Sequence, residues 1–144
     1  MRIELRNDKV IIDGYVNAVA RDSRPIRDRA TGERFVEQIV PGAFKRALER
    51  NEVLLLLNHD ENRQLGSTAT NLTLYEDEIG LRAHAEIEDA EVIKKARMKK
   101  LRGWSFGFKE WGASEETMPG GMKRRFVEDM ELVEVSIIDE RKMA

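Results

Sequence analysis

A run of five consecutive apolar residues, Val53 to Leu57, constrains the fold of this chain more than any other segment. The run has the length of a strand and carries no polar residue on either face, so it predicts a strand buried on both sides. Such a strand lies inside a sheet. The polar sequence Asn58-His59-Asp60 follows it, and we expect the chain to return to the surface there.

The remaining patterns predict a mainly β (α+β) protein, a small closed β-barrel with surrounding helices. Alternating and β-branched segments predict further strands over residues 10–19 (with a bulge or bend at Gly14), 35–40, 72–74, 80–87, 104–111 and 125–138. Helices are predicted from Ala43 to Arg50 and, behind the capping residue Asp89, to about Lys100. Residues 21–34 and 112–121 are polar and contain proline and glycine, so we expect exposed connections.

Composition excludes several classes of function. The 144 residues suit one domain, and the net charge of -2 without a basic face argues against a nucleic-acid partner. The absence of cysteine excludes disulfides, thiolate catalysis and cysteine-bound zinc. No stretch has the apolar core of a signal peptide or the length of a membrane span, so we expect a soluble intracellular protein without a membrane partner.

The two histidines lie in different patterns. His84 shares its strand face with Arg82, Glu86 and Glu88, which predicts a solvated position. His59 follows the buried run, where a rigid strand reaches the surface, and functional side chains are often presented in this way. A structural role for His59 remains an alternative at this point.

Ser105 lies within an unusual strand pattern, Gly103-Trp104-Ser105-Phe106-Gly107-Phe108. Alternation directs the aromatic residues to one face and the serine, flanked by two glycines, to the other. The glycines would leave empty space beside the hydroxyl, as a nucleophile needs when a substrate approaches. Small residues packed under a neighbouring element would produce the same pattern.

Glu134 is expected to share a strand face with the apolar residues Met130, Leu132 and Ile138 and with Ser136. A carboxylate buried among apolar residues needs a partner, and a histidine would serve. An exposed edge strand or an arginine ion pair would also explain the glutamate. Ser105, His59 and Glu134 together would form a nucleophile, a general base and an orienting acid.

Metal hydrolysis through His59, Asp60 and Glu61 is disfavoured because no second ligand cluster joins them, and we expect no metal or cofactor.

The chain resembles the prohead (procapsid-maturation) proteases of tailed bacteriophages, which are related to the herpesvirus assemblins. The resemblance runs from about Gly14 to Ile138. The stretches that carry it, in order, are Glu37-Gln38-Ile39-Val40-Pro41-Gly42-Ala43-Phe44, Leu57-Asn58-His59-Asp60, Leu65-Gly66-Ser67, Glu76-Asp77-Glu78-Ile79-Gly80-Leu81, Leu101-Arg102-Gly103-Trp104-Ser105-Phe106-Gly107-Phe108 and Leu132-Val133-Glu134-Val135-Ser136.

This resemblance implies a serine endopeptidase that cleaves scaffolding and capsid proteins, and itself, inside the assembling procapsid in the host cytoplasm. It implies Ser105 as nucleophile, His59 as base and Glu134 as acid, in an assemblin-like barrel. Assemblins have a second histidine in the third position, so Glu134 is a departure from them. By analogy with assemblins it also suggests a homodimer and a contribution of Arg141 to the oxyanion hole.

Two alternatives to capsid maturation stay open. One is a catalytically silent β-barrel that acts as an assembly or scaffolding module of the capsid. The other is a prophage-encoded peptidase of the same chemistry that acts on cellular substrates. Members of the family run on past the last strand, whereas this chain ends at Ala144. We therefore expect one peptidase domain over residues 1–144 with a truncated or self-processed C-terminus.

Overall fold

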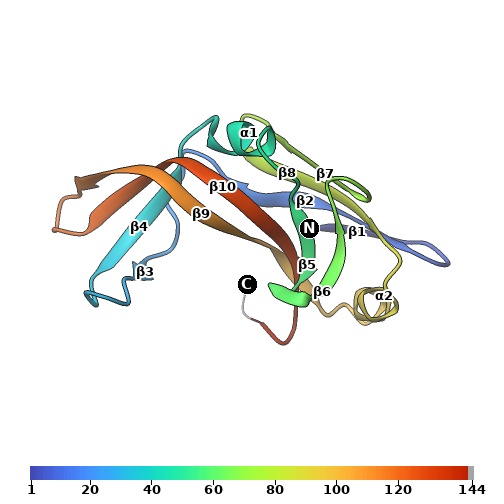
Figure 1. The fold of residues 1–144 in the computed structure, drawn as a ribbon. Helices are drawn as coiled ribbons and strands as arrows, with labels where there is room; N and C mark the ends of the chain where they lie inside the picture. Colours follow the sequence, from blue (N-terminus) through green and yellow to red (C-terminus); the bar gives the residue numbers. More distant parts are fainter. Residues whose placement is uncertain (143–144) are drawn as a thin grey trace.

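The computed structural model describes residues 1–142, and the expected truncation at Ala144 lies outside them. Strands hold 56% of the chain and helices 10%, which confirms the mainly β class. The strands form two sheets, and the view in Figure 1 is dominated by the long curved pair β9 (Leu101–Thr117) and β10 (Lys123–Asp139). Within the described residues no closed barrel is found, so the barrel stays a prediction.

The first sheet is antiparallel, in the strand order β1-β2-β8-β7. Its strands are β1 (Arg2–Leu5), β2 (Val10–Ala18), β7 (Leu72–Glu76) and β8 (Gly80–Ile87). The β2–β8 ladder has a register shift between Tyr15 and Asn17, close to the bend expected at Gly14. One face of β2 and β8 is largely buried, as at Ile12 and Ala85, because apolar residues alternate with polar ones along both strands.

The second sheet is organised around β10. Antiparallel β9 pairs with one edge of β10 along its whole length. Its other edge pairs in parallel with two shorter strands, β4 (Arg34–Ile39) and then β5 (Leu54–Leu57). The outer strands are β3 (Ile26–Arg27) beside β4 and β6 (Asp60–Ser67) beside β5. Since β5 lies between β10 and β6 with three of its leucines buried, the internal strand predicted from the apolar run is confirmed.

Two helices pack against the hydrophobic core through their buried residues. Helix α1 (Ala43–Leu48) buries Phe44, whose ring meets that of Phe106 edge to face. Helix α2 (Ala90–Arg97) begins at Asp89, whose carboxylate accepts a hydrogen bond from the main-chain N–H of Val92, as the capping pattern predicts. Figure 1 shows α1 at the top and α2 at the lower right. Neither helix, in the part of the chain that the structure describes, has the length and apolar character needed to cross a bilayer.

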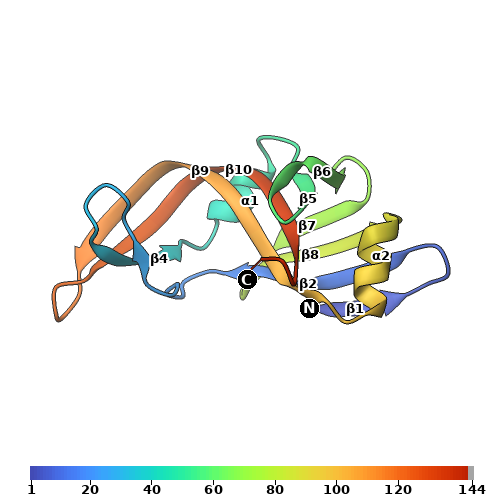
Figure 2. The ribbon, with the colours of Figure 1, turned by 90° about the horizontal axis from the view of Figure 1, so that it is seen from below.

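The exposed hairpin connection predicted over residues 112–121 is present but shorter than expected. Strand β9 continues to Thr117 and β10 starts at Lys123, so the two strands form an arm that projects away from α2 (Figure 2). The arm is held by cross-strand ion pairs, in which Arg124 meets Glu116 and Arg125 meets Glu115. Oppositely charged pairs of this kind stabilise a ladder without producing a hydrophobic alternation. The short strands β1 and β3 and the polar strand β6 were not predicted either.

Candidate active site

The register of β9 against β10 gathers the candidate residues on one face of the sheet. Ser105 lies opposite Ser136, and Gly107 lies opposite Glu134. Directly paired residues of antiparallel strands direct their side chains to the same face, and residues two positions apart share it. The serine and the glutamate therefore lie on a common surface, although they come from different strands.

A β-bulge in β10 corrects the strand face that was expected for Glu134. The register shifts between Leu132, which pairs with Phe108, and Glu134, which pairs with Gly107. Phe108 and Gly107 are neighbours on β9 and point to opposite faces, so Leu132 and Glu134 also do. The extra residue, Val133, thus turns the carboxylate away from the aromatic face and toward Ser105.

His59 enters this face from the hairpin turn between β5 and β6. Leu57 pairs with Asp60, so only Asn58 and His59 form the turn, and their φ angles are +55° and +59°. Two consecutive left-handed residues are the signature of a type I′ turn, in which asparagine is favoured and a histidine replaces the usual glycine. A non-glycine residue in this region is strained by about 1–2 kcal/mol, and such strain is often found at functional sites.

The three side chains form a continuous chain of hydrogen bonds. His59 Nε2 lies 2.9 Å from Ser105 Oγ, and His59 Nδ1 lies 2.5 Å from Glu134 Oε1. An ionised carboxylate only accepts, so Nδ1 must carry the proton and Nε2 of the neutral ring is free to accept from the serine hydroxyl. This arrangement can make the Ser105 oxygen nucleophilic.

Glu134 is buried, with 8% of its side chain exposed, whereas the His59 side chain is 41% exposed. Ser136 compensates for the burial: its hydroxyl donates to Glu134 Oε2 at 2.6 Å and accepts from the main-chain N–H of His59 at 3.0 Å. Both carboxylate oxygens thus have a donor, as a buried charge requires. The sequence places Ser136 two residues after Glu134, but its contact with the His59 turn follows only from the fold.

The two glycines beside Ser105 differ in function, which corrects the expectation of empty space on both sides. A methyl group at Gly103 would meet nothing within 4 Å, so that side is open. At Gly107 it would lie 2.6 Å from Glu134 Oε1. The missing side chain at Gly107 therefore makes room for the carboxylate and not for a substrate.

We predict that Gly107→Ala lowers kcat about 10²-fold, the effect expected when a catalytic group is displaced by about 1 Å. The added methyl group would push the Glu134 carboxylate away from His59. Steady-state cleavage of a peptide substrate measures the loss. Gly112→Ala on the same strand is the matched control, because its methyl group would make an ordinary 3.7 Å contact with Asp129. Equal activities of the two variants would contradict this explanation.

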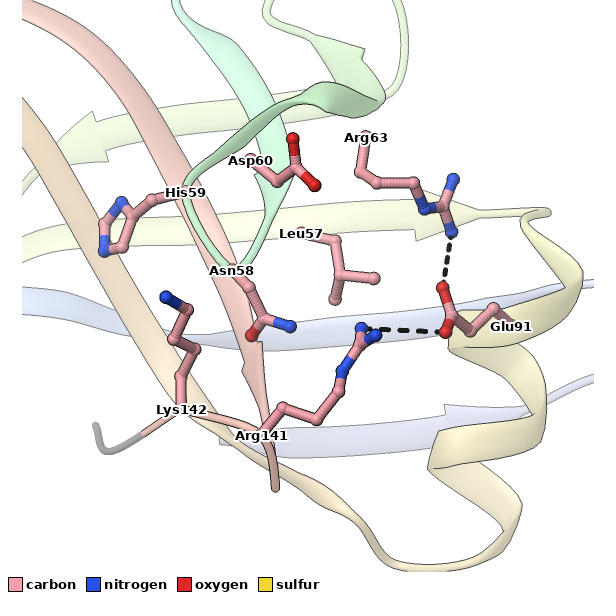
Figure 3. Close-up of a pocket in the computed structure, with 8 residues that line it drawn as sticks. All are labelled: Leu57, Asn58, His59, Asp60, Arg63, Glu91, Arg141 and Lys142. Carbon is pink, nitrogen blue, oxygen red and sulfur yellow. Dashed lines mark hydrogen bonds and ion pairs between the residues drawn. The ribbon is translucent and has the colours of Figure 1, made fainter.

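A charged cleft of about 550 Å³ adjoins His59 (Figure 3). Its cationic residues are Arg63, Arg141 and Lys142, and Arg63 and Arg141 both reach Glu91, at 3.0 and 3.6 Å. In Figure 3 the His59 ring points away from Arg63 and Arg141, and the Lys142 side chain extends toward it. Arg141 donates its guanidinium N–H groups to the Asp139 carboxylate. Within residues 1–142 it has no hydrogen bond to Ser105 or His59, so its contribution to an oxyanion hole stays a prediction.

The described residues contain no group of three or more metal-ligating side chains.

His84 lies apart from the site, as its pattern predicted. Its side chain is 42% exposed, and its Nδ1 lies 2.8 Å from Asp13 on the neighbouring strand β2. The chain therefore has one histidine in the cluster and one outside it.

The family described as caudovirus prohead serine protease matches residues 1–140. No curated protein and no solved structure matches the chain.

Proposed function

Because the chain belongs to the caudovirus prohead serine protease family, we propose that it is a serine endopeptidase that cleaves scaffolding and major capsid proteins, and itself, during maturation of the phage prohead. The observation that carries the proposal is the bridging position of His59 between Ser105 and Glu134. We place one peptidase domain over residues 1–144. The homodimer suggested by the assemblin resemblance remains a prediction.

In the proposed mechanism, Ser105 Oγ attacks the carbonyl carbon of the peptide bond while its proton passes to His59 Nε2. The carbonyl electron pair moves to its oxygen, and Glu134 stabilises the imidazolium through Nδ1–H. His59 then gives the proton to the leaving nitrogen as the C–N bond breaks, which leaves an ester on Ser105. Water then attacks the ester carbon while His59 Nε2 takes one of its protons. His59 passes that proton to Ser105 Oγ as the bond between the acyl carbon and Oγ breaks, which releases the acid product and restores the hydroxyl.

A fluorophosphonate reagent tests the activated hydroxyl without knowledge of the substrate sequence. We expect a single adduct on Ser105, identified by peptide mass spectrometry, and at least a 100-fold slower reaction in His59→Ala, since a general base contributes about 10²–10⁴-fold. The remote histidine supplies the control, because His84→Ala should react at the wild-type rate. Cleavage of purified procapsid proteins by the same preparation then tests the substrate class.

A silent assembly module gives a different result in this experiment. Its serine would react no faster than other exposed serines, and His59→Ala would change nothing. A labelled protein that leaves procapsid proteins intact but cleaves other proteins would favour the cellular peptidase instead.

A further inference from the structure

Both residues of the turn that carries His59 donate their main-chain N–H groups to residues near the end of β10. Asn58 donates its main-chain N–H to the carbonyl of Ile137 at 2.9 Å, and its side-chain Nδ2 donates to Asp139 Oδ1 at 2.9 Å. In return, the main-chain N–H of Asp139 donates to Asn58 Oδ1 at 3.0 Å. The Asn58 carboxamide thus makes a two-point contact that joins residues 81 positions apart.

Asp139 is fully buried at the centre of this contact. Burial by itself raises the pKa of the Asp139 carboxyl, but hydrogen bonds from Arg141 and Asn58 outweigh it and lower that pKa to about 2. Asp139 is therefore an ionised group with fixed donors on both oxygens, and its geometry is well determined. Figure 3 shows Asn58 at the inner edge of the cleft, between His59 and Arg141.

The turn needs an external support. His59 is in the strained left-handed region, and its side chain is 41% exposed, so little packing fixes the ring. The β5–β6 ladder has register shifts between Leu55 and Leu56 and between Leu56 and Leu57, immediately before the turn. Such irregularities disrupt the ladder locally and bend the strand, so the contacts with β10 add to what fixes the direction of the turn.

We propose that Asn58 and Asp139 are a positioning pair that holds the His59 turn against β10, so that the imidazole spans Ser105 and Glu134. Neither residue takes part in proton transfer. Their effect on peptide cleavage rests on the proposed peptidase function, whereas their effect on the His59–Glu134 contact can be measured without it.

Asn58→Gly is the most informative variant, because glycine adopts the left-handed conformation without strain and only the carboxamide is lost. We expect kcat for a peptide substrate to fall about 10²-fold, with KM nearly unchanged. NMR of the imidazole groups gives the second readout, since the chain contains only His59 and His84. In a Ser105→Ala background, which prevents self-cleavage, Asn58→Gly should abolish the downfield Nδ1–H signal of His59 and leave the His84 signals in place.

Two further variants separate positioning from general stability. Asn51→Gly is the matched control, because Asn51 also donates its carboxamide to a main-chain carbonyl of β10, at Leu132, on the other side of the Val133 bulge from Asp139. It should keep both kcat and the His59 signal. Asp139→Asn retains an oxygen acceptor and the main-chain donor and should recover most of the activity that Asp139→Leu loses.

The proposal is overturned if folded Asn58→Gly keeps the wild-type kcat, or if its kcat falls while the His59 signal stays unchanged. Comparable losses in Asn51→Gly would overturn it as well, because they would reflect general destabilisation. If the wild-type protein cleaves no procapsid protein, the proposed function fails, but the imidazole signals still decide whether Asn58 and Asp139 hold His59.

Discussion

Ser105→Ala is expected to lower kcat on the order of 10⁶-fold, the loss seen when a serine nucleophile is removed from a catalytic triad. The substitution deletes the atom that forms the bond to substrate and leaves His59 and Glu134 in contact. The fold should persist, since Ser105 is only partly buried and its hydroxyl contacts the exposed His59 ring. Cleavage of procapsid proteins, followed by gel electrophoresis, and thermal unfolding together measure both expectations.

Ser114→Ala provides the control for this experiment, because Ser114 lies on the same strand β9 and is exposed. It should cleave at the wild-type rate. Continued cleavage by purified, folded Ser105→Ala protein would rule out Ser105 as the nucleophile, whatever the behaviour of the control.

Glu134→Gln is expected to lower kcat about 10⁴-fold, as the equivalent acid-to-amide change does in a serine protease triad. The amide keeps the size of the carboxylate but loses its charge, so it neither stabilises the imidazolium nor requires Nδ1 to carry the proton. An imidazole with its proton on Nε2 cannot accept from Ser105. The measurement is kcat at the pH of maximal wild-type activity.

Glu128→Gln is the appropriate comparison, because Glu128 lies on β10 but its side chain is exposed. This variant should retain full activity. If Glu134→Gln retained it as well, the buried carboxylate would be a structural partner of Ser136 and His59, and the third catalytic role would have to be assigned elsewhere.

Much of the candidate site could be predicted from local sequence. The apolar run before Asn58 indicated a buried strand with His59 at its end, and alternation around Ser105 separated the serine from the aromatic core face. Both features depend on side-chain direction within a single strand, which the period of two determines. Glu134 was selected for a partly wrong reason, since the apolar residue Leu132 lies on the other face of β10.

The roles of Ser136 and Gly107 could not be predicted, because each depends on a neighbour across the sheet. Whether Gly107 faces a substrate or a carboxylate depends on which residue of β10 lies opposite it. Ser136 serves Glu134 and His59 only because the turn after β5 arrives at this point of β10. No periodicity in one segment contains that information.

The sequence by itself determined the mainly β class, the internal strand before His59 and the serine-bearing face of β9. Only the tertiary structure decided that His59 meets Ser105, 46 residues away, and Glu134, 75 residues away. The physical reason is that alternation specifies a direction for each side chain, whereas meeting in space depends on strand register. Here the direction of Glu134 depends on the bulge at Val133, and the position of the His59 turn depends on the contact between Asn58 and Asp139. Both require the complete sheet.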